Sequence, residues 1–304
     1  MDWVAPDIAE PPARAPRPTA PPPGAATGLR PPELRRLAPM TVPDILDGGF
    51  AILRRAPATI LAFTAVFVVP IQVLGAWLNR GTPGLDLGGA IERGDTIQLG
   101  GASGASGAAY LVLQLGPKIA LVYVAAALAR LVSAWQVGHD LTLGELLRVT
   151  ITRSWPLLAS WVLVHLLEGV SIVGLGVLPL AVMTWFIVTA PVIGAEGIGP
   201  IAAMRRSARL VARRFWMVLG IALLGLLVES LFGLAIGLLP TLLSAVFGTR
   251  GIGWVLPAVA GTVTELITMP VVAGITVLIY LDLRVRTEGL DIELDAIDVL
   301  PTEG

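Results

Sequence analysis

The sequence predicts an all-α polytopic membrane protein with six transmembrane helices. Three observations predict this class: a very apolar composition, six apolar runs of membrane-spanning length, and basic residues gathered on one predicted side of the membrane. Hydrophobic residues make up 55% of the 304 residues and charged residues 14%, and the mean hydropathy is +0.80. A water-soluble domain of this length needs far less apolar surface to fill its core, so we expect the excess to face lipid.

The six apolar runs are each long enough to cross a hydrocarbon core of roughly 30 Å, which takes about 20 helical residues. The third and fourth runs are nearly continuous, and one helix would be too long, so we place a break at residues 174–179, where two glycines and a proline occur. The runs cover residues 58–78, 109–131, 155–176, 178–197, 216–239 and 258–282.

Both ends of the chain are expected to be cytoplasmic tails around a six-helix domain at residues 40–290. Residues 1–39 contain 11 prolines and bury too little apolar surface to fold, so they are predicted to be disordered. A proline-rich ligand for a partner domain is the alternative for this segment. Residues 283–304 are the predicted C-terminal tail. No signal peptide is recognised, because no apolar run occurs before about residue 58.

The distribution of basic residues predicts the orientation in the membrane. With the N-terminus inside, the cytoplasmic segments hold 17 of the 21 basic residues. The opposite side holds Arg80, Arg93 and Arg250, and Lys118 lies within a span. This asymmetry is typical of cytoplasmic loops and supports an even number of spans. We therefore expect a multi-pass protein of the plasma membrane with its N- and C-termini in the cytoplasm.

Short amphipathic stretches precede the first, third and fifth spans. Two of them begin with a capping-box pair, Thr41 with Asp44 and Thr142 with Glu145, and all three end in arginine followed by proline or an aromatic residue. Apolar residues at helical spacing opposite arginine are typical of helices that lie in the headgroup plane. The stretches cover residues 41–57, 141–156 and 200–216.

The even-numbered spans also resemble one another, because each contains a proline that is expected to kink it: Pro117, Pro191 and Pro270. Together with the preceding stretches, these spans indicate three copies of one unit, composed of an interfacial helix, a span and a proline-containing span. The alternative is that short apolar helices with arginine ends resemble each other without common repetition.

Five ionisable residues fall inside the predicted spans, at depths near the midplane or in the outer half of the membrane: Lys118, His165, Glu168, Glu229 and Glu265. One interpretation is a buried cation or proton site, or a cavity for a polar substrate or lipid headgroup. The other is a set of ion pairs that fix helix packing, or carboxylates that are simply protonated. A metal site is not expected, because a single intramembrane histidine offers too few ligands.

Five arginines cluster between the fourth and fifth spans. We interpret them as a topology signal and an anchor for anionic lipid, with a specific phosphate-binding role as the alternative. They are Arg205, Arg206, Arg209, Arg213 and Arg214.

The chain lacks the usual signatures of an enzyme. Cysteine is absent, so there is no thiolate nucleophile, and no metalloprotease or nucleotide-binding motif stands in a fitting context. We therefore expect no enzymatic activity, catalytic residue, cofactor or nucleic-acid partner.

Three segments of the sequence carry a resemblance to a known family: residues 41–50 with Arg54 and Arg55, residues 195–216, and residues 280–294. They resemble bacterial integral membrane proteins named after the membrane domain of glycerophosphoryl diester phosphodiesterase. The resemblance covers roughly residues 40–296 and implies a six-helix membrane domain of undefined role. In the relatives that gave the family its name, hydrolysis belongs to a separate soluble barrel. We expect no such barrel in this chain, so the resemblance implies no hydrolase activity.

Two functions follow as hypotheses. The first is a non-enzymatic scaffold or accessory subunit that works with another membrane or envelope protein within the lipid bilayer. The second is a transporter or lipid-handling protein that uses the intramembrane Lys, His and Glu cluster.

Overall fold

The computed structural model describes residues 39–79, 107–174, 177–247 and 255–290. Every regular element in these ranges is helical and none of them is a strand, which confirms the predicted all-α class. The predicted N-terminal tail, apart from residue 39, and residues 291–304 lie outside the described ranges.

Six helical segments in the described ranges are long and apolar enough to cross a membrane, in agreement with the six predicted spans. At the predicted break between the third and fourth spans, the described chain ends in a single 3₁₀ turn, η1 (Ile172–Gly174), and the next described helix begins at Val177. The helices that make up the spans are α3 (Pro57–Asn79), α5 (Gly107–Gln136), α7 (Ser154–Ser171), α8 (Val177–Phe186) with α9 (Thr189–Glu196), α11 (Phe215–Phe247) and α12 (Val255–Glu288).

The prolines of the even-numbered spans act differently from one another. Pro117 and Pro270 lie inside continuous helices, whereas the fourth span is interrupted by a turn at Ile187 and Val188. Pro191 explains the interruption, since it has no N–H for the carbonyl of Ile187 and its ring crowds that carbonyl. The sequence predicts a kink at Pro191, and this turn divides the fourth span into α8 and α9.

Three short helices precede the first, third and fifth spans, as predicted. In the first two, the capping boxes form: the backbone N–H of Thr142 donates to the carboxylate of Glu145 at 2.8 Å, and Thr41 pairs with Asp44 in the same way. These hydrogen bonds hold the pKa of Glu145 and Asp44 below their ordinary values. The helices are α2 (Val42–Arg55), α6 (Leu143–Thr152) and α10 (Pro200–Ala212).

The order of a short helix and two spans occurs three times along the described chain. The three units are α2, α3 and α5; α6, α7 and α8 with α9; and α10, α11 and α12. The third short helix differs from the others, because its N-cap residue is Gly199, which provides no side-chain cap, and Pro200 is its first residue. The element order agrees with the predicted units, while common repetition of the sequence stays a prediction.

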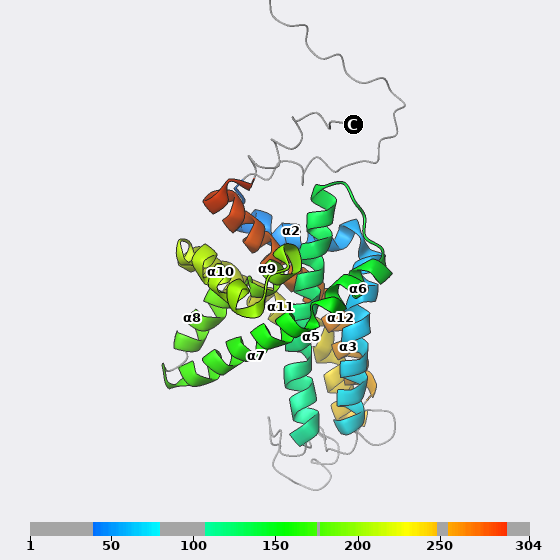
Figure 1. Ribbon diagram of the computed structural model, residues 1–304. Coiled ribbons are helices and arrows are strands. Elements are labelled where there is room, and N and C mark those ends of the chain that lie inside the picture. The colour runs from blue at the N-terminus through cyan, green and yellow to red at the C-terminus, as the bar shows by residue number, and fades with distance from the viewer. Residues whose placement is uncertain (1–38, 80–106, 175–176, 248–254, 291–304) are drawn as a thin grey trace, which may run out of the picture.

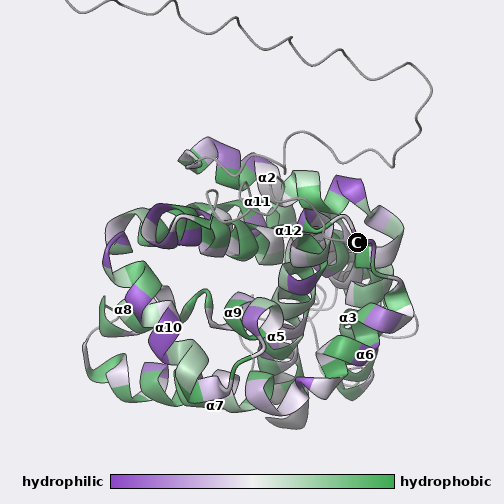
Figure 2. Ribbon diagram, turned by 45° about the horizontal axis from the view of Figure 1, so that its top comes forward, coloured by the Kyte–Doolittle hydropathy of each residue, from purple (hydrophilic) through white to green (hydrophobic). Residues whose placement is uncertain are grey.

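The helix α12 is the centre of the bundle. It packs against α11, α2, α5 and α3, and 83% of its membrane-length segment is buried. In α11 only 11% of that segment is buried, so α11 presents an almost continuous row of exposed leucines. Figure 1 shows α3 and α5 running alongside α12 while α7 and α8 lean away from them. The ribbons are mostly hydrophobic, with hydrophilic segments on α10 (Figure 2). This exposed apolar surface fits a lipid environment.

Two helix crossings depend on small residues. A Cβ atom added at Gly194 of α9 would overlap the carbonyl group of Ala126 in α5, and the facing stretch of α5 is a run of buried alanines and leucine. In the other crossing, a Cβ added at Gly274 of α12 would lie 3.2 Å from the Cα of Gly49 in α2. Lipid tails are as apolar as leucine, so close backbone packing of this kind is a main source of helix association in membranes.

We predict that Gly194→Ala lowers the free energy of unfolding by about 1–3 kcal/mol, because the α5–α9 crossing must open to admit the methyl group. Thermal unfolding of the detergent-solubilised protein measures the effect. Gly220→Ala is the matched control, since nothing lies within 4 Å of its added Cβ. Equal unfolding temperatures for the two variants would contradict the close crossing.

Candidate functional site

Within the described ranges, no network of hydrogen bonds or ion pairs joins all five predicted intramembrane residues. On α7, the Nε2 atom of His165 lies 3.8 Å from the Oε2 atom of Glu168. The Nδ1 of the same histidine donates to the carbonyl oxygen of Trp161 at 2.9 Å. The helix α7 packs mainly on α5, α8, α9 and α10. Both of these contacts of His165 are with residues of α7 itself.

The other acidic pair lies on α11 and α12. Glu229 and Glu265 are close enough to interact electrostatically, and the Glu229 side chain is exposed beside Phe50 and Phe232. Lys118 is exposed on α5. Within the described ranges, no hydrogen bond or ion pair joins Lys118 to either acidic pair, and no group of acidic and histidine residues there could hold a metal ion.

One arginine of the predicted basic cluster is an internal ion-pair residue. Arg206 donates from Nε to Glu196 at 2.6 Å, and its two terminal nitrogens bind both oxygens of Glu288 at 2.8 and 2.9 Å. The hydroxyl of Tyr280 also donates to Glu196, at 2.8 Å. Burial opposes the charge of Arg206, but the hydrogen bonds that it donates to Glu288 and Glu196, together with their negative charge, outweigh it and raise its pKa.

Sequence analysis missed the partners of Arg206. A usable signal existed, since Tyr280, Arg284 and Glu288 recur at intervals of four residues and so share one face of α12. Arg284 indeed donates to Glu288 at 3.1 Å. The remaining arginines of the predicted cluster are exposed, and their role as a topology signal and lipid anchor stays a prediction. They are Arg205, Arg209, Arg213 and Arg214.

A second ion pair fixes the start of the described chain. Asp282 of α12 is completely buried and accepts hydrogen bonds from Arg286 Nε and from the backbone N–H of Met40, at 2.9 and 2.7 Å. Arg286 in turn donates to the carbonyl oxygen of Met40 at 2.8 Å. The backbone N–H and the carbonyl oxygen of Met40 both form hydrogen bonds with side chains of α12, and Asp282 lies 242 residues further along the chain.

Further contacts of the same kind join helix ends. The guanidinium of Arg55 lies 4.3 Å from the ring centre of Trp135, and Arg153 donates to the carbonyl oxygen of Gly197. Together these contacts tie the ends of α2, α5, α9 and α12 to the start of α7 and to α10. We call the group the polar layer. It consists of Met40, Arg55, Trp135, Arg153, Glu196, Gly197, Arg206, Tyr280, Asp282, Arg284, Arg286 and Glu288.

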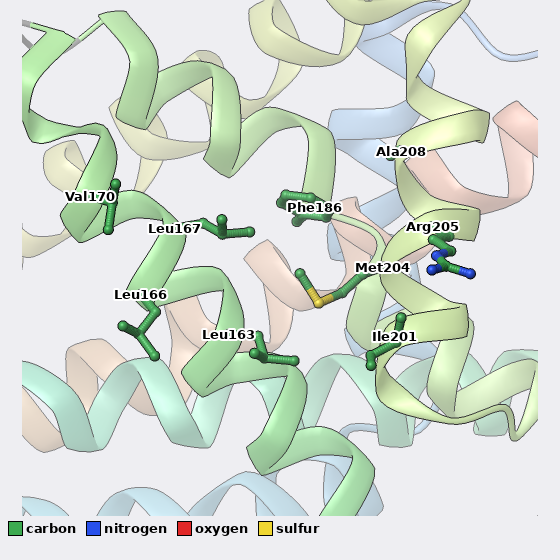
Figure 3. Close-up of a pocket in the computed structure, with 9 residues that line it drawn as sticks. All are labelled: Leu163, Leu166, Leu167, Val170, Phe186, Ile201, Met204, Arg205 and Ala208. Carbon is green, nitrogen blue, oxygen red and sulfur yellow. The ribbon is translucent and has the colours of Figure 1, made fainter.

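An apolar groove of about 520 Å³ lies between α7, α8 and α10. Leucines and a valine of α7 form one wall, Phe186 of α8 lies at one side, and Met204 of α10 faces them (Figure 3). Arg205 is the single charged residue in the described part of the lining, and its guanidinium points away from the apolar side chains (Figure 3). The arrangement resembles an amphipathic binding site, with an apolar body and one cation at its edge.

A smaller cavity of about 350 Å³ lies on the other side of α9, between the ends of α5, α6 and α9. Its lining differs from that of the groove, because it includes the side chains of Arg130, Arg153 and Glu196.

The sequence was compared with family models, curated proteins and solved structures. No family model, no curated protein and no solved structure matches this sequence. The resemblance to the membrane domain of glycerophosphoryl diester phosphodiesterase therefore stays a prediction.

We predict that Arg206→Gln destabilises the protein by roughly 1–3 kcal/mol, because Glu196 and Glu288 lose their common partner in a half-buried position. Arg213→Gln, an exposed change of equal charge on the same segment, is expected to stay within about 0.5 kcal/mol of the unaltered protein. Thermal unfolding in a neutral detergent compares the two. If the ion pairs of Arg206 did not stabilise the protein, Arg206→Gln and Arg213→Gln would unfold at the same temperature.

Proposed function

We propose that the chain is a non-enzymatic plasma-membrane protein that handles lipid, with both termini in the cytoplasm. In this proposal the groove between α7, α8 and α10 holds an acyl chain, and the headgroup of an anionic phospholipid lies beside Arg205. The observation that supports this proposal is the groove itself, whose described lining is apolar except for Arg205.

The size and lining of the groove fit such an occupant. Its volume of about 520 Å³ falls in the usual range for small-molecule pockets, about 300–1,000 Å³. Leu163, Leu166, Leu167 and Val170 are all exposed along α7, so a chain in the bilayer can reach them from the side. The groove thus offers a lateral entry without opening the bundle.

The charge at the edge provides the selectivity in this proposal. A lipid tail gains little from leaving other tails for an apolar groove, because both surroundings are equally apolar. A cation near the headgroup contributes about 1 kcal/mol toward an anionic lipid. Among the described residues Arg205 has no ion-pair partner, so its charge is available to a ligand.

Lipid handling fits the structure better than transport coupled to the intramembrane acidic residues. Coupling of that kind needs the carboxylates, His165 and Lys118 around one path. Among the described residues no hydrogen bond or ion pair joins the α7 pair to Glu229 or Glu265. The groove needs none of these residues.

The second candidate is the accessory-subunit role, and one observation favours it. Glu229 is exposed on α11, where its exposed neighbours are mostly leucines. Carboxylates that face lipid are rare and costly, so a polar group from a partner helix would satisfy this one. A stoichiometric partner that copurifies with the protein and is lost on Glu229→Gln would favour this role.

We predict that the purified protein retains an anionic phospholipid and that two changes reduce it. Ala208→Phe fills the groove and is expected to remove most of the retained lipid, while Arg205→Gln lowers the preference for anionic over zwitterionic lipid roughly five-fold. Native mass spectrometry after mild detergent extraction counts the bound lipids.

Arg213→Gln is the control for the loss of one positive charge, because Arg213 lies on the same segment but does not line the groove. Its lipid content should match that of the unaltered protein. If all four proteins retained the same lipids in the same proportions, the groove would not be a lipid site.

A further inference from the structure

We infer that the cavity between the ends of α5, α6 and α9 is a second binding site, specific for a phosphate group. It has a volume of about 350 Å³ and lies in the polar layer. Arg130 of α5 and Arg153, which joins α6 to α7, both line it. This site is separate from the apolar groove and does not depend on the proposed lipid handling.

The charges around the cavity are unbalanced in favour of an anion. Among the described residues neither Arg130 nor Arg153 pairs with a carboxylate. Glu196 is the one carboxylate of the described lining, and Arg206 and Tyr280 already bind it. Two guanidinium groups therefore face the cavity with their charge uncompensated.

The position of Arg153 is fixed by the backbone. Its guanidinium is partly buried and donates to the carbonyl oxygen of Gly197. Gly197 ends α9 in the left-handed conformation with φ of +70°, and a Cβ at this residue would lie only 2.5 Å from both terminal nitrogens of Arg153. Glycine at this position both ends the helix and leaves room for the guanidinium. The remaining N–H groups of Arg153 are held in one orientation.

Two guanidinium groups in one cavity match a phosphate better than other small anions. Guanidinium binds phosphate through paired N–H donors, and the hydrogen bonds are strengthened by charge. The cavity holds more than a free phosphate ion, so the phosphate of a monoester or diester fits together with part of its organic group. The source is a lipid headgroup or a soluble phosphate ester, and the chemistry of recognition is the same for both.

Binding is tested on the full chain in a neutral detergent by the shift in unfolding temperature with sodium phosphate, against sodium chloride at equal ionic strength. Phosphate should stabilise the unaltered protein more than chloride does. Arg130→Gln should weaken the apparent affinity for phosphate at least about ten-fold, as expected for the loss of a charged hydrogen bond. Arg130 is exposed and without a partner among the described residues, so the variant should keep its fold.

Arg148→Gln is the matched control, because Arg148 is an exposed arginine of α6 that does not line the cavity. It removes the same charge and should respond to phosphate as the unaltered protein does. If Arg130→Gln and Arg148→Gln responded alike, or chloride replaced phosphate, the inference would be wrong.

Nanodiscs distinguish the two sources. In discs of phosphatidylcholine with phosphatidylglycerol, a headgroup ligand would occupy the cavity, so added phosphate should no longer stabilise the protein as it does in phosphatidylcholine alone. A soluble ester as the natural ligand would leave the response to phosphate equal in both discs. Absence of stabilisation by both phosphate and phosphatidylglycerol would overturn the site.

Discussion

The contact of Arg206 with Glu196 and Glu288 joins the second helix unit to the third and fixes α10 against the ends of α9 and α12. Such a contact matters more in this protein than in a soluble one. Outside the bundle is lipid, which removes the hydrophobic gain from burying one apolar helix against another. The arrangement of the helices therefore depends on two other interactions. These are the close packing at Gly194 and Gly274 and the hydrogen-bonded pairs of the polar layer.

Both candidate sites lie beside this contact. The groove uses Arg205 and Ala208, which flank Arg206 on α10, and the smaller cavity uses Glu196, its partner on α9. The ion pairs thus neutralise Arg206 and Arg286, while Arg205, Arg130 and Arg153 have no carboxylate partner among the described residues. This division explains why arginines that look equivalent in the sequence have different surroundings in the fold.

Sequence reasoning was sufficient where local physics decides the outcome. Hydropathy placed the six spans, and the pairs Thr41 with Asp44 and Thr142 with Glu145 marked two helix starts because capping involves neighbouring residues. It failed where contacts join distant segments. Nothing in the sequence ties Met40 to Asp282, and depth along a span cannot tell which way Glu168 or Glu229 points around its helix axis.

Photo-crosslinking to lipid is the most direct measurement of whether the groove holds a phospholipid. A benzophenone amino acid would replace Leu166 in the groove or Leu234 on the lipid-facing side of α11, two leucines that are each 59% exposed. If the groove holds an anionic phospholipid, the probe at residue 166 labels this lipid in excess of its share of the membrane, while the probe at residue 234 labels lipids in bulk proportion. Labelling in bulk proportion at both positions would rule out a lipid site in the groove.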